Sequence, residues 1–275
     1  MITKGDCLES ITPLMIKESI WENHTHLAMG DIRPMLNQDK EGVADDTAKY
    51  FVHGGDGNLF AVLICSNPNS PNLISRSIER ATIAQSILAN AGSVIIDPIA
   101  CGEVNGLSYA IWPLKETFST TRIKRYFQKR KIVPEVFFWL RDVVSLTKVQ
   151  VDDCSNYVQT FNSIARDDEL PDEVRVIARK AESRMGNNRF TPYSVLEHGD
   201  LWVDNILLPL GRSFLPNAKY GFFVIDWAGS RTNGNPFYDL FRFAISAGKQ
   251  RDVLRSEIEI HCTLLGCDVS DVACY

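Results

Sequence analysis

The sequence predicts a two-lobed α+β protein, in which a small antiparallel sheet with one main helix precedes a larger and mainly helical part. Three observations lead to this prediction. Strand-like runs and hairpin turns fill the chain up to residue 113, amphipathic helical patterns dominate after it, and a few short strands return between residues 193 and 225. We therefore expect one lobe in residues 1–113 and a second lobe in residues 114–275.

The first lobe contains a predicted hairpin. Residues 48–53 and 59–65 are strand-like, and the segment Gly54-Gly-Asp-Gly-Asn58 between them has the composition of a tight turn. This turn lacks the GK[ST] ending of a phosphate loop and no helix follows it, so a plain hairpin is the better interpretation. The elements predicted next are a helix over residues 75–91 and strands over residues 93–102 and 107–112.

The second lobe is predicted to be helical around a few short strands. Pro134 and Pro171 each stand at the start of an amphipathic pattern, a position that proline favours. The chain is again helical in pattern from Pro236 to about residue 265. Predicted strands lie at residues 193–197, 206–208 and 220–225.

Composition limits the classes of protein. A hydrophobic content of 45% and a charged content of 23% are typical of a soluble globular protein. The net charge of −5 disfavours general binding to nucleic acid, and no apolar run reaches the roughly 18–20 residues of a membrane span. The seven cysteines include no CxxC pair, and acidic residues stand where a signal peptide would be basic and then apolar. We therefore expect reduced thiols and a cytoplasmic protein.

One polar motif stands between predicted strands. The segment His198-Gly-Asp-Leu-Trp-Val-Asp-Asn205 lies before the strand at residues 206–208, and Asp226 ends the next strand. A hairpin of these two strands would bring Asp226 back beside Asp200 and Asn205. Two carboxylates and an amide oxygen suit Mg²⁺ when phosphates supply the other ligands, and phosphoryl transfer needs little more from a protein. The alternative is that His198 and Asp200 only satisfy backbone groups in a tight turn.

A metal-dependent hydrolase is another alternative. In that case His198, Asp200 and Asp226 would all bind the metal ion, and at least one more histidine would be needed near them. The remaining histidines are His24, His26, His53 and His261.

The motif and the segments after it resemble a known family. Together with Ile225-Asp-Trp227 and Asn235-Pro-Phe-Tyr-Asp-Leu240, it is similar to the signature of the aminoglycoside phosphotransferase and choline kinase group, which has the protein-kinase-like fold. The resemblance implies ATP- and Mg²⁺-dependent transfer of phosphate to a hydroxyl group of a small molecule. It implies that Asp200 is the catalytic base and that Asn205 and Asp226 bind Mg²⁺. The further roles that it implies are support of the catalytic loop by His198 and Asp239, and nucleotide binding by Glu79, Pro113 and Leu114.

The chain departs from this group at one position. The group has an ATP-binding lysine on the strand before the first helix, but residues 59–65 contain no lysine. Lys49 on the preceding strand is one replacement, as in the with-no-lysine kinases, and Arg76 and Arg80 are less well placed. The alternative is a kinase-like relative that binds a nucleotide or a partner but has weakened or lost its chemistry.

The sequence leaves the acceptor open. Residues 122–131 hold six basic residues and two aromatic ones, a pattern predicted to be a solvated helix face and otherwise a patch for an anionic substrate or partner. Acidic residues near the end of the chain would instead suit a cationic acceptor such as an aminoglycoside or choline. The oligomeric state and the choice between ATP and GTP also stay open.

Overall fold

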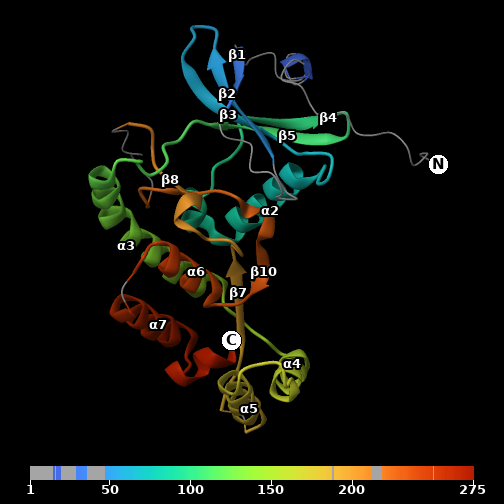
Figure 1. The fold of residues 1–275 in the computed structure, drawn as a ribbon, viewed down its shortest axis with the longest axis vertical. Coiled ribbons are helices and arrows are strands. Elements are labelled where there is room, and N and C mark those ends of the chain that lie inside the picture. Colours follow the sequence, from blue (N-terminus) through green and yellow to red (C-terminus); the bar gives the residue numbers. More distant parts are fainter. Residues whose placement is uncertain are drawn as a thin grey trace, which may run out of the picture.

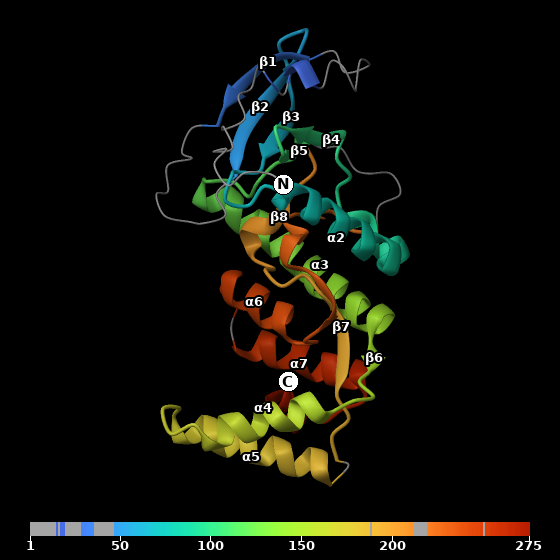
Figure 2. The same ribbon diagram turned by 90° about the vertical axis from the view of Figure 1, so that its right-hand side faces the viewer.

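The computed structural model describes residues 15, 17–19, 29–35, 47–187, 189–211, 219–249 and 251–275. These residues form an antiparallel sheet in the N-terminal part and a mainly helical C-terminal part (Figure 1), so the predicted fold class is confirmed. Between the two parts lies helix α2 (Leu73–Leu88), which both views place under the sheet (Figure 2).

The N-terminal sheet has five antiparallel strands in the order β1-β2-β3-β5-β4. Its strands are β1 (Met29–Pro34), β2 (Ala48–Gly54), β3 (Leu59–Cys65), β4 (Ala100–Val104) and β5 (Leu107–Pro113). The predicted hairpin of β2 and β3 is confirmed, with Gly54 and Gly57 in its turn. The first strand, β1, was not predicted.

One strand prediction is wrong in part. The apolar residues after α2 suggested a strand from residue 93, but Ala89–Val94 is a 3-10 helix and the strand begins at Ala100. Val94 and Ile95 are buried in the core of the C-terminal part, and Ile95 pairs with Val224 by a single bridge. The run is therefore apolar because it contacts the second part of the molecule, not because it belongs to the sheet.

The C-terminal part contains five helices among the residues that the structure describes. They are α3 (Arg122–Thr147), α4 (Ser155–Arg166), α5 (Asp172–Gly186), α6 (Tyr238–Ser246) and α7 (Arg251–Leu265). The helix predicted from Pro134 begins earlier, at Arg122, and Pro134 lies inside it. Both Pro134 and Arg130 are exposed, so the Arg130 carbonyl that loses its N–H partner can bind water. Helix α4 was not predicted; it pairs with α5 away from the sheet (Figure 2).

Short strands connect these helices and carry the polar motif. A three-stranded sheet has the order β10-β7-β6, and β8 pairs with β9 in a separate hairpin. These strands are β6 (Val149–Gln150), β7 (Tyr193–Glu197), β8 (Ile206–Leu207), β9 (Phe223–Val224) and β10 (Arg231–Gly234). Three 3-10 helices in this part are η2 (Val203–Asn205), η3 (Trp227–Gly229) and η4 (Val269–Cys274).

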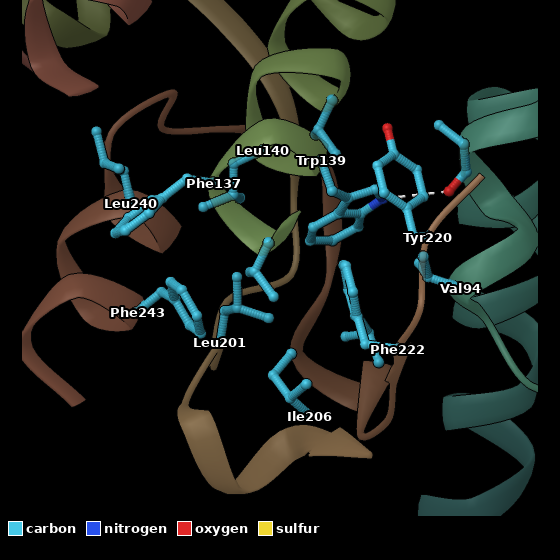
Figure 3. Packing of buried hydrophobic residues seen from close by; sticks show 14 of the residues in the cluster. Val94, Phe137, Trp139, Leu140, Leu201, Ile206, Tyr220, Phe222, Leu240 and Phe243 are labelled. Atoms are coloured by element: carbon cyan, nitrogen blue, oxygen red, sulfur yellow. Dashed lines mark hydrogen bonds between the residues drawn. The ribbon is translucent and has the colours of Figure 1, made fainter. Parts of the chain in front are cut away.

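The main hydrophobic core fixes the position of these strands. Trp139 of α3 is 1% exposed, its ring meets Phe222 edge to face, and its Nε1–H donates to the Ala91 carbonyl (Figure 3). Leu201, within the motif, and Ile206, directly after it, are buried in the same cluster. The polar motif is thus held between core residues. No helix among the described residues is long and apolar enough to cross a membrane.

Candidate functional site

The loop that carries the polar motif, residues 198–205, begins directly after β7. Gly199 has φ of +84°, and a Cβ built there would lie 2.8 Å from the Gly229 carbonyl oxygen. Glycine is therefore required, both for the backbone conformation and for the close approach to η3. This approach brings the loop after β7 against the segment that follows Asp226.

Asp239 at the start of α6 holds the first residues of the loop. Its two carboxylate oxygens accept the backbone N–H groups of His198 at 2.5 Å and Gly199 at 3.1 Å. Burial raises the pKa of Asp239 to about 7, and the two N–H donors act in the opposite direction. The expected supporting role of this residue agrees with these contacts.

His198 is buried and both of its ring nitrogens have partners. Nε2–H donates to the Ile225 carbonyl at 2.9 Å, and Nδ1 accepts the Asp200 N–H at 3.3 Å. Burial lowers the pKa of His198 to about 4, so the ring is neutral at pH 7. Its position matches a structural role and leaves no ring nitrogen for a metal ion.

A polar stripe on α6 supports the whole loop. Asp239, Arg242 and Ser246 lie three and four residues apart and therefore on one face of the helix. Arg242 contacts Asp200, and the Ser246 hydroxyl accepts the Val203 N–H at 3.0 Å. Sequence analysis identified only Asp239. The available signal was this spacing of polar residues in an otherwise apolar helix.

The Asp200 carboxylate is held through one oxygen. Oδ1 accepts hydrogen bonds from Trp202 Nε1–H and from the Arg242 guanidinium, whose carbon lies 4.0 Å from the centre of the Trp202 ring. The carboxylate is 44% exposed. With Oδ1 engaged in this way, Oδ2 is the oxygen that can accept a proton from a bound molecule.

The hairpin of β8 and β9 brings the proposed metal ligands together. Ile206 pairs with Val224, and the next bond joins the Ile225 N–H to the Asn205 carbonyl at 3.1 Å, so Asp226 follows directly beside Asn205. The Asn205 side-chain Nδ2 donates to the Asp200 carbonyl at 2.8 Å, which leaves its Oδ1 for a cation.

Asp226 is exposed and has left-handed backbone angles, with φ of +68°. A non-glycine residue in this conformation is uncommon and costs backbone strain. Carboxylate and amide oxygens such as those of Asp200, Asp226 and Asn205 suit Mg²⁺ when phosphates supply the other ligands.

The N-terminal sheet presents Lys49 on the face that carries α2. Ser66 and Ser108, whose hydroxyls lie 2.8 Å apart, accept the N–H groups of the first turn of α2. Ile64 shares that face by alternation, and it pairs directly with Lys49 across the neighbouring strand. Lys49 therefore leaves β2 on the α2 face, beside the position where a lysine on β3 would stand.

Glu79 lies elsewhere on α2. It is exposed and lines a cavity with Arg76 and Arg80. Among the described residues, Glu79 takes part in none of the ion pairs. Lys49 is exposed on the α2 face of the sheet, and its role as the phosphate-binding cation stays a prediction.

The connector after β5, residues 113–116, has backbone groups that do not pair with β3. The Leu114 N–H continues the pairing with β3 by donating a hydrogen bond to the Phe60 carbonyl. Glu116 and Leu208 exchange two backbone hydrogen bonds. The Pro113 carbonyl and the Lys115 N–H then point to the opposite edge, because successive groups of an extended chain alternate. The backbone of Pro113 and Lys115, not the Leu114 N–H, is available to a ligand.

Two other sequence features were candidates for binding groups. His24 and His26 lie outside the described residues. The basic stretch predicted as a solvated face forms the start of α3, where Ile123, Tyr126 and Phe127 are each at least 59% exposed. Its Arg125 forms an ion pair at 3.5 Å with Asp204 of the loop at residues 198–205. The described residues contain no group of three or more His, Cys, Asp or Glu placed to bind a metal ion.

Small-molecule kinases are among the solved structures with a similar fold. The choline kinase LicA from Streptococcus pneumoniae is 14% identical, with a TM-score of 0.50, over 90% of this chain and 79% of that chain. An aminoglycoside 3'-phosphotransferase of type VIII is 13% identical, with a TM-score of 0.50, over 94% of this chain and 96% of that chain. A thermostable mutant of the aminoglycoside phosphotransferase APH(4)-Ia is 15% identical, with a TM-score of 0.50, over 93% and 87%. At these identities the likeness shows the fold alone.

No curated protein sequence matches the chain. A family model does match it, over residues 102–259, which is more than half of the 275 residues and includes the loop, the β8–β9 hairpin and α6. The chain belongs to the ecdysteroid kinase-like family.

Proposed function

We propose that the protein transfers the γ-phosphate of ATP to a hydroxyl group of a small molecule, with Mg²⁺ as cofactor. The observation that supports this most is the convergence of Asp200, Asn205 and Asp226 at one end of the β8–β9 hairpin. Family membership agrees with a kinase-like activity. Phosphoryl transfer depends on positioning and charge stabilisation, and this arrangement supplies both.

Each residue has a defined role in this proposal. Asp200 orients the acceptor hydroxyl through Oδ2 and accepts its proton as the oxygen attacks the γ-phosphorus and ADP leaves. Asn205 and Asp226 would hold Mg²⁺, which neutralises phosphate charge when bound. The adenine would lie against the Pro113 carbonyl and the Lys115 N–H. Lys49 would approach the phosphates from the α2 face.

The acceptor belongs to the small hydroxylated molecules. The family is named after kinases of ecdysteroids, and the solved relatives include a choline kinase and aminoglycoside phosphotransferases. A screen of ATP consumption should therefore compare hydroxylated steroids, choline, amino sugars and aminoglycosides.

A second candidate function is nucleotide or partner binding without efficient catalysis. Ile64 stands where a lysine on β3 would face α2, and Glu79 takes part in none of the ion pairs among the described residues. These two observations favour a weakened nucleotide site. The hydrolase is disfavoured because both ring nitrogens of His198 already bind backbone groups.

The decisive experiment replaces the base. With an acceptor from the screen, Asp200→Asn should lower turnover by a factor on the order of 10² or more, because a positioned base contributes about that much. Asp204→Asn is the matched control, since Asp204 lies in the same loop with an 88% exposed side chain. Wild-type turnover in Asp200→Asn would refute the proposal, and ATP binding without turnover in the wild type would favour the second candidate.

A further inference from the structure

A separate cavity of about 450 Å³ opens between α2 and β10. It does not include Asp200, Asn205 or Asp226. Its lining residues are Arg76, Glu79, Arg80 and Ile83 of α2, Leu196 of β7, and Ser230, Arg231, Thr232 and Asn233 at and before β10. The volume lies in the range of small-molecule sites, which is about 300–1,000 Å³.

The charge of this lining is unbalanced. Three guanidinium groups face one carboxylate, and Arg76 and Arg80 take part in no ion pair among the described residues. Arg231 pairs through Nε with the buried Glu197 at 3.3 Å, which leaves its terminal nitrogens for another partner. Like charges gathered in one cavity repel one another, so an anion that enters gains attraction from several donors at once.

The chemistry of the lining identifies the anion. Guanidinium groups bind phosphate and sulfate by paired, charge-assisted hydrogen bonds, and Ser230, Thr232 and Asn233 add polar groups on the β10 side. Ile83 and Leu196 add an apolar wall, so the cavity suits a molecule larger than a bare ion. We propose that this cavity is a binding site for a small molecule that carries a phosphate or sulfate group.

The site differs from the proposed nucleotide site in its elements. The nucleotide would contact the connector after β5, Lys49 of β2 and the β8–β9 hairpin, whereas the cavity lies between α2 and β10. Because α2 also packs against η3, the segment directly after Asp226, an occupant would contact a helix that touches the metal-binding loop. Binding at the cavity does not require phosphoryl transfer, so it can be tested independently of the proposed function.

Calorimetric titration with inorganic pyrophosphate tests the site. The whole chain is used in metal-free buffer of low ionic strength, where pyrophosphate supplies two linked phosphate groups. Arg80→Gln and Arg231→Gln should each weaken binding about fivefold or more, as expected for a lost charged hydrogen bond. Glu79→Gln should strengthen binding by a factor on the order of 3, because it removes the opposing charge. This opposite sign separates charge recognition from damage to the fold.

Two controls make the result decisive. Arg255→Gln removes an exposed guanidinium of α7 that pairs with Glu259, and it should leave pyrophosphate binding unchanged. Affinity for a non-hydrolysable ATP analogue with Mg²⁺ should be the same in the wild type, Arg80→Gln and Arg231→Gln. The proposal is overturned by absence of pyrophosphate binding in the wild type, by equal weakening in Arg255→Gln, or by parallel loss of analogue binding, which would assign these arginines to the nucleotide.

Discussion

Arg242 and Asp200 form an ion pair that joins helix α6 to the loop at residues 198–205, and the Trp202 ring lies against the same guanidinium. Both partners are partly exposed, with side chains 32% and 44% accessible, so the pair adds little to stability. Its value is geometric, because two donors on Oδ1 fix the rotamer of the proposed base and leave Oδ2 toward the acceptor. In the proposed function, Arg242 is therefore a positioning residue.

Arg242→Gln should lower kcat by about tenfold, with a much smaller change in KM for ATP, because the base loses orientation while the nucleotide contacts stay. Arg242→Lys should restore part of the loss, since lysine keeps the charge but cannot stack on Trp202 in the same way. Steady-state kinetics on both variants, with matched melting temperatures, check this. Equal kcat in Arg242→Gln and the wild type would show that Asp200 is oriented without the pair.

Lys49→Ala should reduce ATP-dependent turnover strongly, because the phosphates lose the cation proposed to approach from the α2 face. The double variant Lys49→Ala/Ile64→Lys should regain activity, since Ile64 is the cross-strand partner of Lys49 on the same face. Lys180→Ala, on the exposed face of α5, is the control. If Lys49→Ala keeps full turnover, the relocated lysine is excluded and the cation must come from elsewhere.

Asp226→Ala should abolish the Mg²⁺-dependent tightening of ATP binding, because it removes the principal proposed metal ligand. Asn205→Ala should weaken the same effect, and Asp204→Ala should not, although it neighbours Asn205 in the loop. Calorimetry of ATP binding with and without Mg²⁺ measures this. A metal effect that persists in Asp226→Ala would place the ion on other ligands.

The lowered pKa of His198 predicts that this residue contributes to folding stability in a pH-dependent way. Its folded-state pKa of about 4 lies below the unfolded value of 6.5, so the contribution is present above pH 6.5 and is lost as the pH falls toward 4. The contribution of Asp239, whose pKa is raised, changes with pH in the opposite direction. The quantity to compare is therefore the difference in unfolding free energy between the wild type and His198→Asn. The destabilisation caused by His198→Asn should therefore be smaller at pH 5 than at pH 7, by roughly 2 kcal/mol. Urea unfolding at both pH values measures it, and a difference that does not change with pH would mean that His198 titrates normally.

The sequence predicted the local features of the site well. Residues 198–205 and Asp226 stand next to short apolar strands, and pairing of such neighbours needs only a hairpin, which the structure confirms in Ile206 and Val224. Asp239 was found through its motif. These features depend on contacts between residues that are close in the chain or fixed by a signature.

The features that the sequence did not predict depend on distant contacts. Arg242 meets Asp200 only because α6 packs under the loop, and the burial of Val94 and Ile95 depends on the C-terminal core. Pro134 suggested a helix start, but an exposed proline within α3 loses only one bond that water can replace. In each case tertiary packing overrode a local pattern.

The β8–β9 hairpin determines which residues would keep their spacing if the N-terminal sheet moved relative to the C-terminal part. The Asn205 carbonyl accepts the N–H of Ile225, the residue before Asp226, within one hairpin, and the Asn205 side chain also holds the backbone of Asp200. Lys49 and the sheet belong to the other part of the chain. A hinge movement between the two parts would therefore change the distance from Lys49 to the phosphates while the spacing of base and metal ligands stayed constant. In the proposed function, opening and closing would admit and release the nucleotide while Asp200 and Asn205 stay in contact.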